Sequence, residues 1–211
     1  MTGKSSTLRQ RLRQTTAEAM LDSAERAMLR KGYERATMAE IAEAAGCATG
    51  TFYLYFKNKE ELLQAIVARH TKAIFGAVRT AMDEVDDPVQ KLRKSAAAHL
   101  RYIHDNQPFF RMLFTAIPMG HRSLHQRLSN ASIRLHDDFT RLELEIIRRG
   151  QKQGKIRGDI SAEILQEFMM SAGFGMVEHF VFSPDPPSLH QQFRVLWGLI
   201  AAAIGAENGE H

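Results

Sequence analysis

The chain has 211 residues, of which 44% are hydrophobic and 25% are charged, and its formal net charge is +4. This composition is typical of a globular protein with its own core, and the single cysteine, Cys47, excludes an internal disulfide framework. No stretch approaches the roughly 18 uninterrupted apolar residues of a membrane span, and the N-terminus lacks the apolar run of a secretory signal. We therefore expect a cytoplasmic protein that does not contact the membrane.

The positive charge is concentrated at the N-terminus. Lys4, Arg9, Arg11 and Arg13 all precede the first acidic residue, Glu18. Two interpretations fit this pattern. Residues 1–14 are either a solvated, disordered terminus or a basic arm that follows a phosphate backbone.

Helical patterns follow in chain order, and because strand signals are nearly absent we predict an all-α fold. A Thr-x-x-Glu capping box at residues 15–18 predicts the start of the first helix, which Gly32 ends. Thr37 can cap a second, short helix over residues 38–45, and a third helix is predicted over 49–56. Together they predict a three-helix domain, residues 15–60, that contains a helix-turn-helix.

A larger helical domain is predicted over residues 61–205. Asn58 begins a long helix that continues to about Val85, out of the first domain. Proline and other helix-start signals then predict helices over residues 88–105, 108–117, 121–149, 160–182 and 188–204. We expect the last residues, 206–211, to be disordered.

The segment from Thr37 to Phe56 has the spacing of a helix-turn-helix. Apolar positions from both helices are expected to face inward, namely Ile41, Ala42, Ala45, Phe52 and Phe56. Gly46 permits the sharp turn between them. A second set of residues is then left to face outward, with no core to serve: Thr49, Thr51, Tyr53, Leu54 and Tyr55.

Three pieces of sequence resemble one family when they are joined. They read Thr-Met-Ala-Glu-Ile-Ala-Glu-Ala-Ala-Gly at 37–46, Gly-Thr-Phe-Tyr-Leu-Tyr-Phe at 50–56 and Lys-Glu-Glu-Leu-Leu at 59–63. Residues 12–69 thereby resemble the DNA-binding domain of the tetracycline-repressor-like (TetR) family of bacterial regulators. The resemblance implies a sequence-specific transcriptional regulator, and members of the family are usually repressors. It also implies that a small and largely apolar effector releases the protein from its DNA operator.

The resemblance also implies roles for single residues. Thr37 would contact phosphate, and the residues implied to lie against base edges are Thr49, Gly50, Thr51 and Leu54. The residues implied to clamp phosphates are Tyr53, Tyr55 and Lys59. Because one such domain makes few base contacts, we expect a homodimer on a palindromic operator.

Two positions depart from the family pattern. Ala48 stands where a serine often caps the reading helix, so a hydroxyl-to-amide bond worth about 1 kcal/mol is lost unless Thr49 replaces it. Cys47 stands where an aliphatic residue is usual. We interpret it as a small buried hydrophobic residue, and not as a redox switch.

Dimerisation is expected from the last two long helices, which carry wide apolar stripes. The stripe residues expected at the interface are Phe168, Met176, Phe180, Phe193, Trp197 and Ile200. A wide stripe also suits a helix in the core of one chain. The family resemblance implies instead that the two helices form half of an intermolecular four-helix bundle.

The middle helices are rich in phenylalanine and methionine, which suit both a core and an adaptable pocket. The residues expected to line an effector cavity are Phe110, Phe114, Phe139, Met169 and Phe174. Possible polar anchors are Tyr102, His104, His136 and Glu143. His121 and His125 have the i, i+4 spacing of two metal ligands, but solvent-facing histidines explain it better. We expect no metal and no cofactor.

Two other functions compete with the regulator. A helical enzyme would use histidine and carboxylate residues of the second domain, but the chain has no Gly-x-Ser-x-Gly, no Gly-rich phosphate loop and no Glu-x-x-His pair. A DNA-compacting protein would carry lysine and arginine at the reading positions. Threonines, a glycine and tyrosines favour selective reading of bases together with phosphate contacts.

Overall fold

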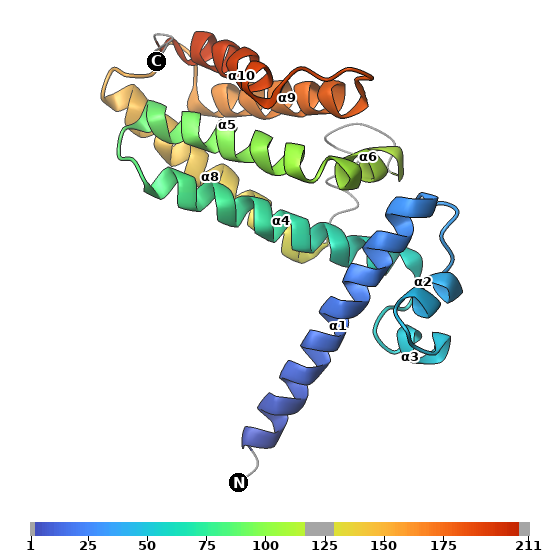
Figure 1. The fold of residues 1–211 in the computed structure, drawn as a ribbon. Coiled ribbons are helices and arrows are strands. Elements are labelled where there is room, and N and C mark those ends of the chain that lie inside the picture. The colour runs from blue at the N-terminus through green and yellow to red at the C-terminus, as the bar shows by residue number, and fades with distance from the viewer. Residues whose placement is uncertain (1–2, 117–128, 207–211) are drawn as a thin grey trace.

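The computed structural model describes residues 3–116 and 129–206, and every regular element within them is an α-helix (Figure 1). The all-α prediction is confirmed. The N-terminal helices are α1 (Gly3–Lys31), α2 (Met38–Ala44) and α3 (Thr49–Tyr53). Figure 1 shows α2 and α3 beside the second half of α1, while the first half of α1 projects away from the rest of the molecule.

The remaining helices form a larger bundle. They are α4 (Lys59–Asp83), α5 (Pro88–Asp105), α6 (Gln107–Ala116), α8 (Asn130–Lys152), α9 (Ala162–Phe182) and α10 (Leu189–Ile204). In Figure 1, α9 and α10 lie above α5, and α4 and α8 lie below it. Across the described residues, no helix is long and apolar enough to cross a membrane.

The first helix begins earlier than its sequence predicts. Thr15 and Thr16 do not cap it, because their hydroxyls donate to the carbonyls of Arg11 and Leu12, one turn earlier, at 3.0 and 2.9 Å. A Thr-x-x-Glu sequence caps a helix only where the preceding chain is not helical. Here the preceding residues are mostly leucine, arginine and glutamine, which favour helix, so the helix continues through the predicted arm.

Other helix starts agree with the predicted caps. The Thr37 hydroxyl accepts from the Glu40 amide, and the Glu40 carboxylate accepts from the Thr37 amide, which completes a capping box at α2. Asn58 caps α4 by accepting from the Glu61 amide at 2.7 Å. Lys31, which pairs with Glu40 at 2.6 Å, and Thr37 lower the pKa of Glu40 to about 2.

The N-terminal core joins the small domain to the bundle. Its fully buried side chains include Ile41 and Phe52, and it continues through Leu62 and Ile66 of α4 to Phe109 of α6. The predicted domain boundary at residues 60–61 therefore lies inside α4, whose first turns belong to this core. A movement of α4 cannot leave the small domain unaffected, because the two share side-chain packing.

Candidate nucleic-acid interface and internal cavity

The α3 helix presents a polar and apolar row to solvent. Thr49, Gly50 and Thr51 are exposed, and Leu54 and Tyr53 keep 74% and 47% of their surface. An exposed Leu54 has no packing role in the chain. The predicted outward row is therefore confirmed at these positions as a matter of geometry.

Buried groups hold this row in place. Phe52 has no exposed surface, and its ring centroid lies 5.6 Å from that of Phe56. Gly46, with φ of 68°, makes the turn between α2 and α3, a backbone conformation that disfavours other residues. Cys47 is half-buried and packs against the N-terminal core, which agrees with a small hydrophobic role.

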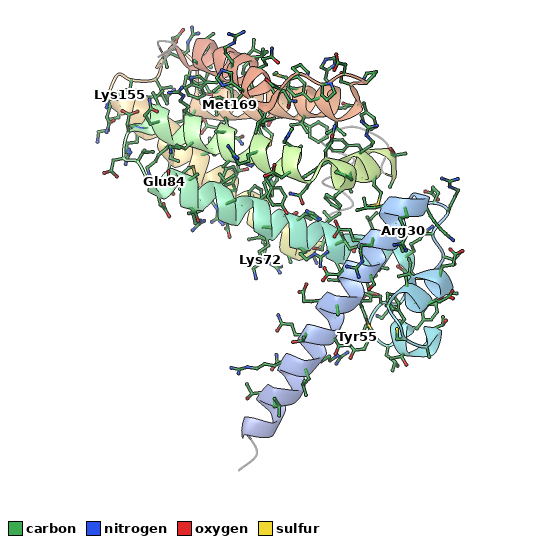
Figure 2. All side chains as sticks on the ribbon, in the orientation of Figure 1. Arg30, Tyr55, Lys72, Glu84, Lys155 and Met169 are labelled. Atoms are coloured by element: carbon green, nitrogen blue, oxygen red, sulfur yellow. The ribbon has the colours of Figure 1, made fainter. Side chains whose placement is uncertain are left out.

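Tyr55 differs from the prediction, because it does not point freely outward. It is half-buried against the N-terminal core, and the Arg13 guanidinium lies 5.7 Å from its ring centroid. Figure 2 shows Tyr55 between α1 and the α2–α3 pair. Tyr55 therefore places a basic side chain of α1 close to the end of α3.

The start of α3 has no side-chain cap. Ala48 stands at the N-cap position with extended backbone, and no side chain bonds to the free amides there. We predict that Ala48→Ser raises the free energy of unfolding by about 1 kcal/mol, because serine can accept from one of these amides. Chemical denaturation of both proteins measures the change. A serine variant that is no more stable would show that water already satisfies the amides equally well.

Lys59 has a structural contact that its sequence did not reveal. Its ammonium donates to the carbonyls of Tyr33 and Glu34, both at 2.8 Å, and lies 4.6 Å from the Tyr33 ring centroid. It fastens the connection between α1 and α2 to the start of α4. Phosphate contact by Lys59 stays a prediction, and a Lys59 variant is expected to lose stability as well as affinity.

A cavity of about 250 Å³ lies inside the larger bundle. Its lining includes all five residues expected from the sequence, namely Phe110, Phe114, Phe139, Met169 and Phe174. Figure 2 shows Met169 among the upper helices, far from Tyr55 in the small domain. Effector binding by these residues stays a prediction.

The polar part of the lining differs from the expected anchors. His104 is exposed and does not line the cavity, and Tyr102 is not in the lining either. Glu143 and His136 do line it. The lining also includes polar residues that were not predicted from the sequence, namely His70, Thr71, Ser95 and His99. Ser95 and His99 share a helix face with Leu92 and Ala96, and this periodicity could have identified them.

Burial shifts the pKa values of two of these side chains in opposite directions. Burial raises the pKa of Glu143 to about 7, although hydrogen bonds from Gln166 and Ser95 act against the shift. Burial lowers the pKa of His99 to about 4, and the charge of His136 adds to this effect. The Ser95 carbonyl lies 3.1 Å from His99 Nδ1. At neutral pH, His99 is therefore uncharged and Glu143 is close to half-ionised.

His70 connects the cavity to α1. It lines the cavity from α4, its Nε2 lies 3.0 Å from Glu25 Oε1 on α1, and its Nδ1 lies 2.9 Å from the Tyr102 hydroxyl on α5. Its ring stacks on Phe109 with centroids 3.6 Å apart. Tyr102, expected in the cavity wall, thus supports a wall residue from behind.

An ion-pair cluster reinforces this junction. Arg69, the neighbour of His70 on α4, pairs with Asp22 at 2.5 Å and also with Glu25, both on α1. Burial alone would raise the pKa of Glu25, but His70 and Arg69 lower it below its ordinary value. One turn of α4 therefore holds α1 through charged contacts and lines the cavity at the same time.

Two family models match this chain. The model of the bacterial regulatory proteins of the tetR family matches residues 20–66, and the model of the tetracyclin repressor-like C-terminal domain matches residues 85–180. The chain belongs to the TetR family. The first match runs from α1 to the first turns of α4 and the second from the start of α5 to α9, and neither match nor the relatives below support an enzyme.

Curated relatives of this TetR-family chain include an uncharacterised HTH-type transcriptional regulator of Mycobacterium tuberculosis. It is 36% identical over 90 residues, which are 43% of this chain and 45% of the relative, so the match spans under half of that protein. The regulator TtgR of Pseudomonas putida is 28% identical over 83% of this chain and 85% of its own length.

Solved structures share the fold. PfmR from Thermus thermophilus, a TetR family transcriptional regulator, has a TM-score of 0.66 and 25% identity, over 91% of this chain and 99% of that one. FadR from Bacillus subtilis, in complex with stearoyl-CoA, has a TM-score of 0.75 and 19% identity, over 89% and 98%. Because FadR is only 19% identical to this chain, its similarity concerns the fold alone.

The expected dimer residues of this TetR-family chain need correction. Phe180, Trp197 and Ile200 are buried in the core of their own chain, and Ile200 lines the cavity, so they are not free to form an interface. Met176 and Phe193 are half-buried against the same core. Of the expected set only Phe168, 45% exposed, faces solvent.

Other apolar residues of the last two helices are also exposed. Ile164 on α9 keeps 63% of its surface, and Val195 and Leu199 on α10 keep 52% and 48%. The apolar stripe of each of these two helices is thus wide enough to have a buried side and an exposed side. The spacing of apolar residues in the sequence did not show which residues belong to which side. We call Ile164, Phe168, Val195 and Leu199 the outer face.

In the part of the chain that the structure describes, no three histidine, cysteine or acidic side chains lie close enough together to hold a metal ion. His121 and His125, the pair with metal-ligand spacing, lie outside the described residues.

Proposed function

We propose that this TetR-family chain is a sequence-specific transcriptional repressor that binds a palindromic operator as a homodimer. The proposal rests on one observation: α3 and Leu54, the residue that follows it, expose Thr49, Thr51 and Leu54, while buried Phe52 anchors the helix. An exposed row of this kind has no packing function in the chain. A helix of these dimensions fits the major groove, where hydroxyl groups bond base edges and apolar groups contact the thymine methyl.

We assign the recognition of bases and the attraction to DNA phosphates to different residues. The exposed row of α3 carries no charge, so it contributes selectivity and little of the phosphate attraction. Arg11 and Arg13 are exposed on the projecting part of α1, next to α3 through the contact of Arg13 with Tyr55. We therefore assign phosphate contacts to α1 and Tyr53, with Thr37 and Lys59 as further predicted contacts.

The cavity supports release by a small effector. An effector that fills it touches His70, whose other side contacts Glu25 on α1. A ligand that binds better to a conformation with altered α1–α4 contacts shifts the population toward that conformation. One protein of the same fold, FadR from Bacillus subtilis, holds stearoyl-CoA, and this agrees with the scheme. The cytoplasm is the proposed location.

Selection of bound duplexes from a random pool tests this proposal. We expect enrichment of a palindromic consensus with two half-sites. Thr49→Ala should change the preferred bases within each half-site, whereas Lys59→Ala should weaken binding to all duplexes about equally and flatten its salt dependence. No enrichment over the input pool would contradict sequence-specific binding, and would favour a DNA-compacting role if binding still falls with salt.

A further inference from the structure

We propose that the cavity selects a ligand with an apolar body and a cationic amine head, which pairs with the carboxylate of Glu143. This inference rests on the effector role proposed above and names the chemical class of the effector. It starts from an acidic side chain that is 7% exposed and yet lines an otherwise mainly apolar cavity. A buried carboxyl group is costly unless a partner compensates for its lost hydration.

The partners that the chain itself supplies to Glu143 are weak and neutral. The Gln166 amide donates to Glu143 Oε2 at 3.3 Å, which is long for a hydrogen bond to a carboxylate, and Ser95 is the other partner. Neither carries a charge. An ammonium group in the cavity would supply the missing positive charge beside a carboxyl group that is itself buried, where the attraction between the two charges is stronger than at an exposed site.

Aromatic rings near Glu143 suit a cation as well. Phe139 precedes Glu143 by one turn on α8, also lines the cavity, and stacks on Phe75 with ring centroids 4.7 Å apart. Ring faces attract an ammonium group and its adjacent methylene groups. Phe110 and Phe114 of α6, whose ring centroids lie 6.1 Å apart, also line the cavity and offer apolar surface for the body of the ligand.

An anionic head group fits this cavity poorly. Among the lining residues that the structure describes, none is a lysine or an arginine. Lys91, one turn before Ser95 on α5, donates to the Met82 carbonyl at 2.7 Å, and Arg149 on α8 donates to the Asp86 carbonyl. A carboxylate or phosphate would thus enter without a lysine or arginine as counter-charge, and would share the cavity with the acidic Glu143.

The titratable neighbours of Glu143 determine the expected pH dependence. The lining contributes His99 from α5, His136 from α8 and His70 from α4, while α9 contributes the neutral Gln166. His99 stays uncharged between pH 6 and 8, because its pKa is about 4. Glu143, with a pKa of about 7, changes from mostly protonated to mostly ionised over that range, so it pairs with an ammonium group better at pH 8.

The test compares three probes of equal chain length on the full chain: octylammonium, 1-octanol and octanoate. Binding is followed by the fluorescence of Trp197, the one tryptophan of the sequence, which packs beside the cavity residues Leu196 and Ile200, and by calorimetry. We expect octylammonium to bind tightest and octanoate weakest. The affinity of octylammonium should rise about tenfold from pH 6 to pH 8, following the ionised fraction of Glu143, while the affinity of 1-octanol should not rise.

Two variants separate the carboxylate from general effects. Glu143→Gln should remove both the preference for octylammonium and its pH dependence, and keep the binding of 1-octanol. Glu145→Gln, at an exposed position of the same helix, should behave as the unmodified protein. If Glu143→Gln does not fold, the pH profile and the probe order of the unmodified protein still decide the matter.

Two results would overturn the inference: octanoate that binds as tightly as octylammonium, or a Glu143→Gln variant that keeps the preference. Operator binding is measured on the same preparation, so the failures can be told apart. Protein that binds its selected duplex but not the amine contradicts this inference alone. Protein that binds the amine but no duplex selectively contradicts the proposed function.

Discussion

Replacing Phe52 by alanine is expected to lower the free energy of unfolding by about 3–5 kcal/mol and to abolish operator binding. Phe52 has no exposed surface, contacts Phe56 and holds α3 against α2. Its removal leaves a cavity under a helix of only five residues, Thr49–Tyr53, which has little stability of its own. Urea denaturation measures the stability, and fluorescence anisotropy of a labelled duplex measures the binding.

Tyr53→Ala is the matched control for that experiment. Tyr53 is the next residue on the same helix and is 47% exposed, so its replacement should leave stability almost unchanged and weaken DNA binding only through lost contacts. If Phe52→Ala binds the duplex normally, α3 does not present the reading residues. If both variants are equally unstable, the assignment of an inner and an outer side to α3 is wrong.

A double replacement on the outer face, Val195→Glu with Leu199→Glu, is expected to convert the dimer to a monomer and to lower operator affinity by about 100-fold or more. Both residues are about half exposed on α10, and the glutamates of two copies would repel one another across a two-fold interface. A monomer loses the gain in affinity from binding two half-sites at once, which is about 10²–10⁴-fold. Sedimentation and duplex titration measure the two effects.

Leu29→Glu serves as the control for surface charge. Leu29 is another exposed apolar residue, 37% exposed, but it lies on α1 and not on the two helices, α9 and α10, that carry the outer face. This variant should remain dimeric. A double variant that still sediments as a dimer would show that the outer face is not the interface.

Local sequence signals predicted much of the fold, because each acts within a few residues. The predicted helix over 88–105 coincides with α5, where Asp87 accepts from the Gln90 amide and Pro88 occupies the first turn. Ser188 caps α10 with a capping box to Gln191. These hydrogen bonds depend on neighbours in the chain and not on packing with distant helices.

Features set by tertiary packing were harder to predict. Helical periodicity placed Trp197 and Phe168 on apolar stripes, but only the packed bundle decides that Trp197 faces inward and Phe168 outward. Likewise His70 became a candidate only when the fold brought Glu25 and Tyr102 to its two ring nitrogens. Residues 25, 70 and 102 are too far apart in the chain for any spacing rule to join them.

The most direct test of sequence-specific binding compares two duplexes of equal length and base composition, one with the selected half-sites and one with both half-sites scrambled. Dissociation constants are measured for each at several salt concentrations. We predict that the selected duplex binds about 10³-fold tighter or more at physiological salt, with one dimer covering both half-sites. Equal affinity for the two duplexes would contradict sequence-specific reading by α3.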